Sequence, residues 1–191
     1  MIKMRIWLIT SVLLLLSACS AIEKEQPVNY YVLDAKPSAI TTKTITQSIA
    51  IDRVELPDYL NQPNIVLRDD SQKLHVAYYH SWADDLGSSI RRVIISELNV
   101  LSNDSRFSAR CTDCESIKLS LNHFYPTTQG EVVLAGDYQI RPLNEAMTTQ
   151  SFLITLDLEN DGYEHAVEKM RLALFELAAK INNTLTALAS K

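Results

Sequence analysis

The sequence contains little glycine, few cysteines and no dense run of positive charge. Its four glycines, at positions 87, 130, 136 and 162, are too scattered to form a GxGxxG turn, a Walker loop or a GxSxG elbow. Nucleotide chemistry therefore has no glycine-rich loop to use. The formal net charge is −5. Because phosphate backbones and anionic lipid surfaces attract clustered cations, we expect no nucleic-acid partner and no electrostatic adhesion to a membrane.

Side chains for metal or acid–base chemistry are also sparse. The histidines, at positions 75, 80, 123 and 165, show no spacing typical of metal ligands. Two carboxylate pairs occur, Asp69-Asp70 in a predicted turn and Asp84-Asp85 near a predicted helix start. We interpret them as a turn and a helix cap rather than an acid–base dyad. We expect no metal, no cofactor and no catalytic residue, and hence no enzyme.

The apolar run of residues 6–16 follows Lys3 and Arg5 and ends at Leu16-Ser17-Ala18-Cys19. This run is shorter than the roughly 20 residues that cross a bilayer. Basic residues, a short apolar core, small residues and a cysteine stand in the order of a bacterial lipobox, which the stretch resembles. The resemblance implies a signal peptide over residues 1–18 and acylation of Cys19, with palmitate-type chains. An ordinary signal peptide with an incidental Cys19 is the alternative, and both imply export.

Signal removal leaves 173 residues with a net charge of −7, because Lys3 and Arg5 leave with the signal. This length suits one domain. Residues 19–28 lack apolar periodicity and are predicted to be a tether, with a single domain over residues 29–191. In lipoproteins of two-membrane bacteria, an Asp after the acylated cysteine usually means retention at the inner membrane. Ser20 stands there instead, which favours the outer membrane, at its periplasmic face.

Cys111 and Cys114 are the remaining cysteines, and in an exported chain a disulfide closing a short loop is the first interpretation. A zinc site would need four ligands, and no second CxxC follows. A thioredoxin-type redox motif would open a helix. Residues 116–121 instead alternate as a strand does, so redox catalysis is the weaker reading.

Apolar periodicity predicts both strands and helices in the mature chain. Period-two patterns predict strands at residues 29–33, 48–56, 65–68, 74–79, 117–121, 132–140 and 152–158. Apolar stripes spaced at three and four predict one helix from an N-cap at Ser81 to Leu101 and another from a capping box at Asp161 to Leu188. The predicted fold class is α+β, with one mixed or mostly antiparallel sheet and two long amphipathic helices packed on it.

Three large side chains near predicted loops are candidates for partner binding. Tyr59 and Leu60 lie in a loop bounded by Pro57 and Pro63, where exposed apolar side chains would indicate a contact surface. Trp82 is the third candidate. Ordinary packing around the first helix is the competing interpretation for all three.

Several stretches resemble the PqiC (YmbA) family of auxiliary lipoproteins. They are Asn29-Tyr30-Tyr31-x-Leu33, Val54-x-Leu56-Pro57-Asp58-Tyr59-Leu60, Ile65-Val66-x-Arg68, Trp82-Ala83-x-x-Leu86, the segment 130–136, and Asp161-Gly162-Tyr163. The matching positions carry no catalytic role, and Cys111 and Cys114 lie outside the pattern. The resemblance implies an α+β domain anchored at the outer membrane. It also implies two partners that move phospholipids between the membranes, a periplasm-spanning MCE protein and its inner-membrane component.

Two other functions compete with this one. A stand-alone periplasmic binder of lipid or another small ligand would need a sizeable apolar cavity between sheet and helices. An enzyme would need a nucleophile, a base and an oxyanion site, and the sequence shows no such arrangement. Ring or tube assembly with an MCE protein would favour self-association, which would make this protein a homo-oligomer.

Overall fold

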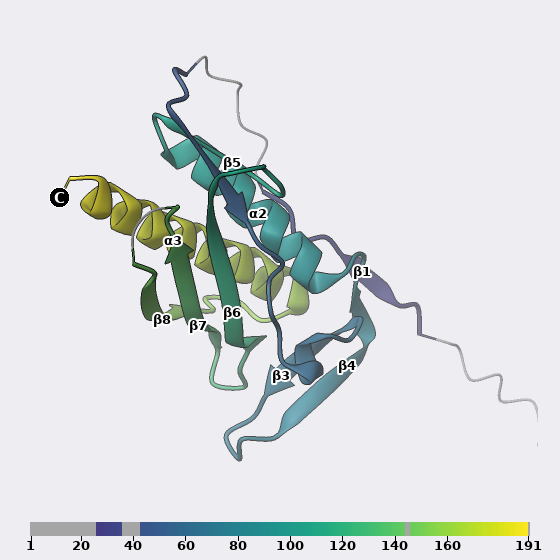
Figure 1. Ribbon diagram of the computed structural model, residues 1–191. Coiled ribbons are helices and arrows are strands. Elements are labelled where there is room, and N and C mark those ends of the chain that lie inside the picture. The colour runs from purple at the N-terminus through teal and green to yellow at the C-terminus, as the bar shows by residue number, and fades with distance from the viewer. Residues whose placement is uncertain (1–25, 36–42, 144–145, 191) are drawn as a thin grey trace, which may run out of the picture.

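The computed structural model describes residues 26–35, 43–143 and 146–190. The elements in chain order are β1 (Asn29–Tyr31), β2 (Gln47–Ile51), the 3-10 helix η2 (Asp58–Leu60), β3 (Asn64–Arg68), β4 (Leu74–Trp82), α2 (Leu86–Leu101), β5 (Ser105–Ser108), β6 (Glu115–Pro126), β7 (Glu131–Arg141), β8 (Thr148–Asp157) and α3 (Tyr163–Ala189). The predicted α+β class is confirmed (Figure 1). Within the described ranges, no helix combines the length and apolar character needed to cross a bilayer.

A five-stranded mixed sheet in the order β5-β2-β6-β7-β8 carries the core. β2 runs parallel to both β5 and β6, whereas β6, β7 and β8 are antiparallel. The strands predicted at residues 117–121 and 132–140 are confirmed as parts of β6 and β7, which pair as a hairpin with Gly130 in its turn at φ 80°. Alternate side chains of these strands face α3 and are buried, as period-two patterning requires: Ile117, Leu119, Leu121, Leu134, Tyr138, Ile140, Phe152 and Ile154.

A β-bulge interrupts the pairing of β6 with β7. Leu121 pairs with Gly136 and His123 with Ala135, so Asn122 is the extra residue. A Cβ atom at position 136 would overlap the carbonyl oxygen of Ser120 and come within 2.9 Å of the Leu121 Cα atom. The two backbones can approach this closely because residue 136 has no side chain.

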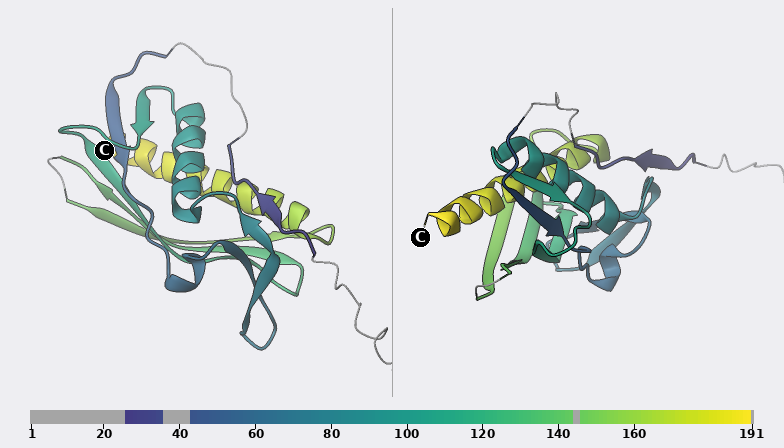
Figure 2. Two further views of the ribbon diagram at one scale, coloured as in Figure 1. Left: turned by 90° about the vertical axis from the view of Figure 1, so that its right-hand side faces the viewer. Right: turned by 45° about the horizontal axis from the view of Figure 1, so that its top comes forward.

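The helices cover one face of this sheet (Figure 2). α3 has 27 residues, about 40 Å at 1.5 Å per residue, and buries its apolar stripe on β6, β7 and β8 and against α2. This arrangement confirms the predicted packing of two amphipathic helices on a sheet. The hydroxyl groups of Tyr138 on β7 and Thr184 on α3 lie 2.8 Å apart and form a hydrogen bond between the sheet and the helix.

The predicted N-cap of the first helix is wrong by four residues and that of the second by one. Ser81 and Trp82 still belong to β4, because Trp82 pairs with Tyr31 and its N–H donates to the Pro63 carbonyl at 2.6 Å. α2 instead begins after Asp85, whose carboxylate accepts from the Ser88 N–H at 2.8 Å.

The N-cap of α3 is Gly162, at φ 108°, and no side chain caps it. The capping box predicted at Asp161 is therefore not formed. A glycine tolerates this positive φ, which would strain most other residues, and the chain can turn sharply from β8 into the helix.

The single predicted sheet is also wrong, since β1, β4 and β3 form a separate three-stranded sheet. The predicted strand at residues 48–56 explains the division. Its ladder ends at Ile51 and resumes only at an isolated bridge between Glu55 and Ser120. Pro57, which has no N–H to donate, and η2 then turn the chain away from the five-stranded sheet. β3 and β4 consequently pair with each other as an antiparallel hairpin, as predicted.

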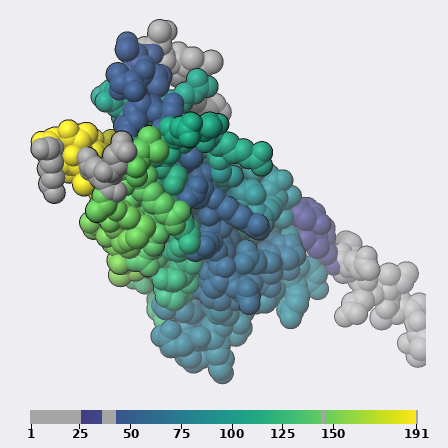
Figure 3. Space-filling view, in the orientation of Figure 1, coloured from purple at the N-terminus to yellow at the C-terminus, as the bar shows by residue number. Residues whose placement is uncertain are grey.

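β1 and the C-terminal end of α3 lie at opposite ends of the molecule (Figures 1 and 3). In the space-filling view, residues 26–35 in purple form one extremity, and the yellow end of α3 forms the other. The signal peptide, Cys19 and most of the predicted tether lie outside the described residues. Of that tether, Gln26, Pro27 and Val28 are described, and all three are exposed.

Candidate functional site

Leu60 and Trp82, far apart in sequence, meet under one surface hollow. The hollow measures about 300 Å³. Its lining comes from the η2 loop and the connection from β4 to α2: Leu60, Asn61, Gln62, Pro63, Trp82, Ala83, Asp84, Asp85 and Leu86. The backbone bond from Trp82 to Pro63 holds the two segments together.

The prediction that Leu60 and Trp82 present apolar surface needs correction. Leu60 is 1% exposed and Trp82 is 6% exposed, because both belong to the hydrophobic core. They form the floor of the hollow, and its rim is polar, with exposed Asn61 and Asp84. A partner at this site would therefore contact mainly the rim.

Tyr59 does not line the hollow, and its side chain is hydrogen-bonded to β6 of the five-stranded sheet. Its hydroxyl donates to the carbonyl of Asn122, the extra residue of the β6 bulge, and lies 3.5 Å from Nδ1 of His123. Its ring is 6.4 Å from the ring of Tyr125. Burial, reinforced by Tyr125 and opposed by Arg68, raises the pKa of Tyr59 to about 12. These contacts give Tyr59 a structural role in joining the two sheets.

A second aromatic group joins the three-stranded sheet to α3. The ring of His80 stacks on Tyr163 at 3.9 Å, and Nδ1 of His80 lies 2.8 Å from the Tyr31 hydroxyl. Burial, with a smaller effect of Glu164, raises the pKa of Tyr31. Tyr31 and Tyr163, which belong to the motifs that resemble the PqiC family, thus meet through a histidine on β4.

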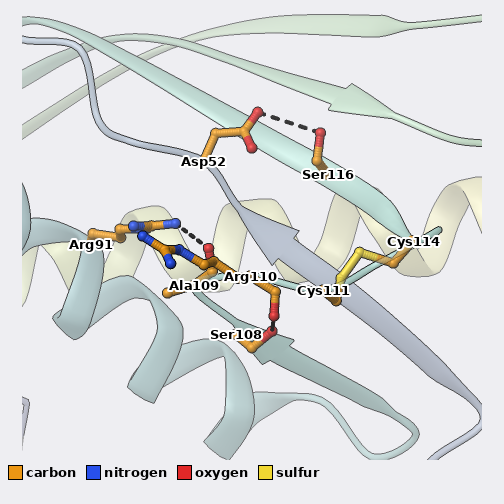
Figure 4. Close-up of a disulfide and its surroundings, with 8 residues drawn as sticks. All are labelled: Asp52, Arg91, Ser108, Ala109, Arg110, Cys111, Cys114 and Ser116. Carbon is orange, nitrogen blue, oxygen red and sulfur yellow. Dashed lines mark hydrogen bonds between the residues drawn. A yellow bond between two sulfur atoms is a disulfide. The ribbon is translucent and has the colours of Figure 1, made fainter.

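Cys111 and Cys114 are joined as a disulfide in the loop between β5 and β6, with Cα atoms 6.0 Å apart (Figure 4). The loop leads directly into β6 and opens no helix. Arg91 of α2 donates one hydrogen bond from Nε to the Ile51 carbonyl at 2.7 Å and another from a terminal nitrogen to the Ala109 carbonyl. The second bond ties α2 to the start of this loop. The surroundings are those of a structural crosslink near an edge strand.

The carboxylate pairs serve local structure, as predicted. Asp69 closes the turn between β3 and β4, and hydrogen bonds from His75, Ser71 and Lys73 hold the pKa of its carboxyl well below its usual range. Asp85 caps α2, and Asp84 lies 2.8 Å from Arg92. Among the described residues, no three His, Cys, Asp or Glu side chains gather as metal ligands would.

Exposed apolar side chains of the β1 region, which were not among the predicted site residues, lie beside exposed tyrosines of β4. Val28, Tyr30 and Val32 all project into solvent from β1 and its flanks, and Tyr78 and Tyr79 are exposed on the neighbouring β4. Apolar residues at the alternate positions 28, 30 and 32 are the feature of the sequence that could have pointed to this group. An apolar alternation marks one face of a strand, but it does not say whether that face meets the core or the solvent.

Comparison with known proteins identifies a family. A family model described as the ABC-type transport auxiliary lipoprotein component matches residues 31–182. No curated protein matches the sequence.

Solved structures share the fold at low identity. A crystal structure of an uncharacterized protein superposes with a TM-score of 0.75 at 18% identity, covering 84% of this chain and 99% of the other. A Xanthomonas campestris protein of the DUF330 family superposes with a TM-score of 0.65 at 10% identity, covering 80% and 92%. The family model spans nearly the whole folded domain, from β1 into α3, and the chain therefore belongs to the ABC-type transport auxiliary lipoprotein component family.

Proposed function

We propose that the protein is a non-enzymatic lipoprotein of an MCE-type system that moves phospholipids between the two membranes and so supports envelope integrity. The observation that carries the proposal is the match of residues 31–182 to auxiliary lipoproteins of ABC-type transport. The lipobox resemblance at Cys19 supports a lipid anchor. The PqiC-like motifs support location at the outer membrane and partnership with an MCE protein and its inner-membrane component. Acyl chains on Cys19 would supply the location, and the folded domain would supply recognition.

The geometry favours docking over carrying a lipid. Four hollows lined by described residues measure about 120 to 300 Å³ each. Pockets that enclose drug-sized ligands occupy ~300–1,000 Å³, and a two-chain phospholipid is larger than such ligands. The alternative of a stand-alone lipid binder therefore has less support than a docking component.

The hollow beside η2 is our candidate for the partner contact. Its floor is Leu60 and Trp82, and Tyr59 holds η2 in place from the other side. Ala83 lies exposed on the rim, so Ala83→Arg adds a long side chain without disturbing the backbone bond from its N–H to Tyr31. We expect this variant to lose its partner while folding normally.

The test is mass spectrometry of proteins that co-purify with the tagged lipoprotein, expressed at native level, from gently solubilised membranes. An MCE protein and an inner-membrane component should dominate the wild-type sample and be depleted from Ala83→Arg. Thr149→Arg, at an exposed position of β8 on the other sheet, is the matched control and should retain them. Purification of the wild type without any transport component would overturn the proposal.

The anchor is tested in the same strains. The intact mass of the wild type should show acyl chains on a protein that begins at Cys19, and Cys19→Ser should lose both the acyl mass and the membrane fraction. Cys111→Ser is the matched cysteine control and should stay acylated. An unacylated wild type would contradict the lipoprotein assignment of Cys19.

A further inference from the structure

The exposed side chains of Val28, Tyr30, Val32 and Tyr79 form what we call the β1 patch. Tyr30 is 69% exposed and Tyr79 is 47% exposed. Such exposure of several large apolar side chains on two adjacent strands calls for a covering surface, since soluble proteins bury most side chains of this kind.

Strand geometry explains why no other element of the domain covers the patch. Successive side chains of a strand point to opposite sides, so positions 28, 30 and 32 share one side of the chain. Residues on the other side point inward: Tyr31 packs against the core and Leu33 is buried within it. β1 is also the edge of its sheet, with β4 as its only neighbour among the described strands. Its outward side thus has no further element to pack on.

The register places Tyr79 of β4 beside this side of β1. Asn29 pairs with His80, so Tyr79, which precedes His80, lies next to Val28. Figure 3 shows the purple segment 26–35 at one extremity of the molecule, and β4 is its paired neighbour. The patch is therefore continuous across the two strands, at the end of the molecule nearest Cys19 in sequence.

We propose that the β1 patch rests on the lipid surface of the membrane that holds the anchor. The inference depends on the proposed acylation of Cys19. The nine residues from Ser20 to Val28 follow Cys19. Even fully extended they span at most about 30 Å, so the patch stays within that distance of the headgroups. The anchor thereby raises the effective concentration of lipid at the patch, and a contact too weak to bind alone is populated.

The chemistry of the patch suits a headgroup layer. A tyrosine ring has an apolar body and a polar hydroxyl, and tyrosine is enriched at membrane–water interfaces for this reason. The patch carries no charge, so its contact should depend little on anionic lipid or on salt. Among the nearby charged groups, Arg92 lies 2.8 Å from Asp84 and 3.5 Å from Asp34, so these three side chains together carry a net charge of only −1.

The contact would orient the whole domain. β1 would face the bilayer, and the C-terminal end of α3, at the opposite end of the molecule in Figure 1, would point into the periplasm. None of the residues that line the hollow beside η2 belongs to the patch.

The test places a fluorescent tryptophan in the patch of the acylated protein. Wild type, Tyr30→Trp and Leu153→Trp are purified from membranes and reconstituted into phosphatidylcholine vesicles, with or without bromine on the acyl chains near the headgroups. Leu153, on β8, is 68% exposed and so matches Tyr30 in exposure while lying on the other sheet. Trp82 is retained in all three proteins as a buried reference.

Brominated chains quench a tryptophan at the headgroup level, so Tyr30→Trp should lose fluorescence roughly twofold relative to unbrominated vesicles. Wild type and Leu153→Trp should lose little. Equal quenching of Tyr30→Trp and Leu153→Trp in an acylated protein would overturn the membrane contact alone. Absence of acyl chains from the intact mass would overturn both the contact and the proposed anchoring.

Discussion

At the scale of single residues, Gly136 is fixed by backbone sterics. A methyl group there would overlap the Ser120 carbonyl oxygen, and a backbone atom cannot move aside as a flexible side chain can. We expect Gly136→Ala to lower the free energy of unfolding by about 1–3 kcal/mol, the usual cost of overpacking. Urea denaturation followed by circular dichroism measures this change.

Gly87→Ala is the matched control for Gly136→Ala. A Cβ at position 87 would meet Leu56 Cδ1 at 3.5 Å, an ordinary contact, and alanine favours a helix over glycine. This variant should be neutral or more stable by up to about 1 kcal/mol. Equal destabilisation by both substitutions would contradict the steric argument.

Tyr59 makes stability depend on pH in the alkaline range. Its pKa is raised from 10.0 to about 12 in the folded protein, so between these values the unfolded chain releases a proton that the folded protein retains. Deprotonation thus favours unfolding, and stability should fall as pH rises from 10 towards 12. Tyr59→Phe removes this titration and also leaves the Asn122 carbonyl without its donor.

Two effects of Tyr59→Phe can be separated by unfolding at two pH values. At pH 8 the variant should be less stable by roughly 1 kcal/mol, the net contribution of one hydrogen bond. Above pH 10 its stability should decline less steeply than that of the wild type. Parallel pH profiles would mean that Tyr59 does not titrate with a raised pKa.

Residue identities near η2 were predictable, but their exposure was not. Tyr59, Leu60 and Trp82 were predicted as candidates for partner binding, and the structure brings Leu60 and Trp82 together under the same hollow. Whether a large apolar side chain lies in the core or on the surface depends on segments distant in sequence. Here Trp82 is buried because β4 extends to it and Pro63 closes over it.

At the scale of elements, the start of α2 depends on a single carboxylate. Asp85 accepts from the Ser88 N–H, and hydrogen bonds from Ser88 lower the pKa of Asp85. We expect Asp85→Ala to cost about 1 kcal/mol of stability, typical of a lost N-cap, as measured by thermal or urea unfolding. Ser81→Ala should leave the helix start unchanged, since Ser81 belongs to β4.

Asp85→Asn tests the charge of this cap. Asparagine also caps a helix, so the variant should lose little stability at neutral pH. The pKa of Asp85 is lower in the folded protein than in the unfolded chain, so its ionised form stabilises the fold at pH values above the usual pKa of an aspartate. This stabilisation is lost as the pH falls through the folded-state pKa. The difference between wild type and Asp85→Asn should therefore shrink in acid, and a pH-independent difference would count against the cap.

The apolar stripes of both helices and most strands were predictable because each pattern is local. β5 was missed, since Ser105–Ser108 is short and lies at an edge. The helix starts were misplaced for a related reason. The motif from Ser81 to Asp84 has the composition of a capping box, but pairing of Trp82 with Tyr31 claims those residues for the sheet. Tertiary hydrogen bonds override a local signal here.

At the scale of the whole molecule, the division into two sheets governs how stability is distributed. Local patterns predicted every strand of the smaller sheet but not its separation, which follows from the interrupted ladder after Ile51 and the turn at Pro57. The larger sheet has three strands of 10 to 12 residues covered by α3. The smaller one has a three-residue edge strand, and its aromatic contacts at Tyr59 and His80 join it to the rest.

This asymmetry predicts two levels of hydrogen-exchange protection. Amides of β6 and β7 should exchange only on global unfolding, whereas those of β1 and β4 should exchange through a local opening of lower free energy, because β1, β3 and β4 bury fewer side chains than β6 and β7. His80→Ala removes the stack on Tyr163 and the contact with the Tyr31 hydroxyl, so it should speed exchange in β1 and β4 and leave β6 and β7 unchanged. Native-state exchange followed by mass spectrometry of peptides resolves the two sheets. Uniform acceleration in both would show instead that the molecule opens as one cooperative unit, with the aromatic group at its centre rather than at a joint between sheets.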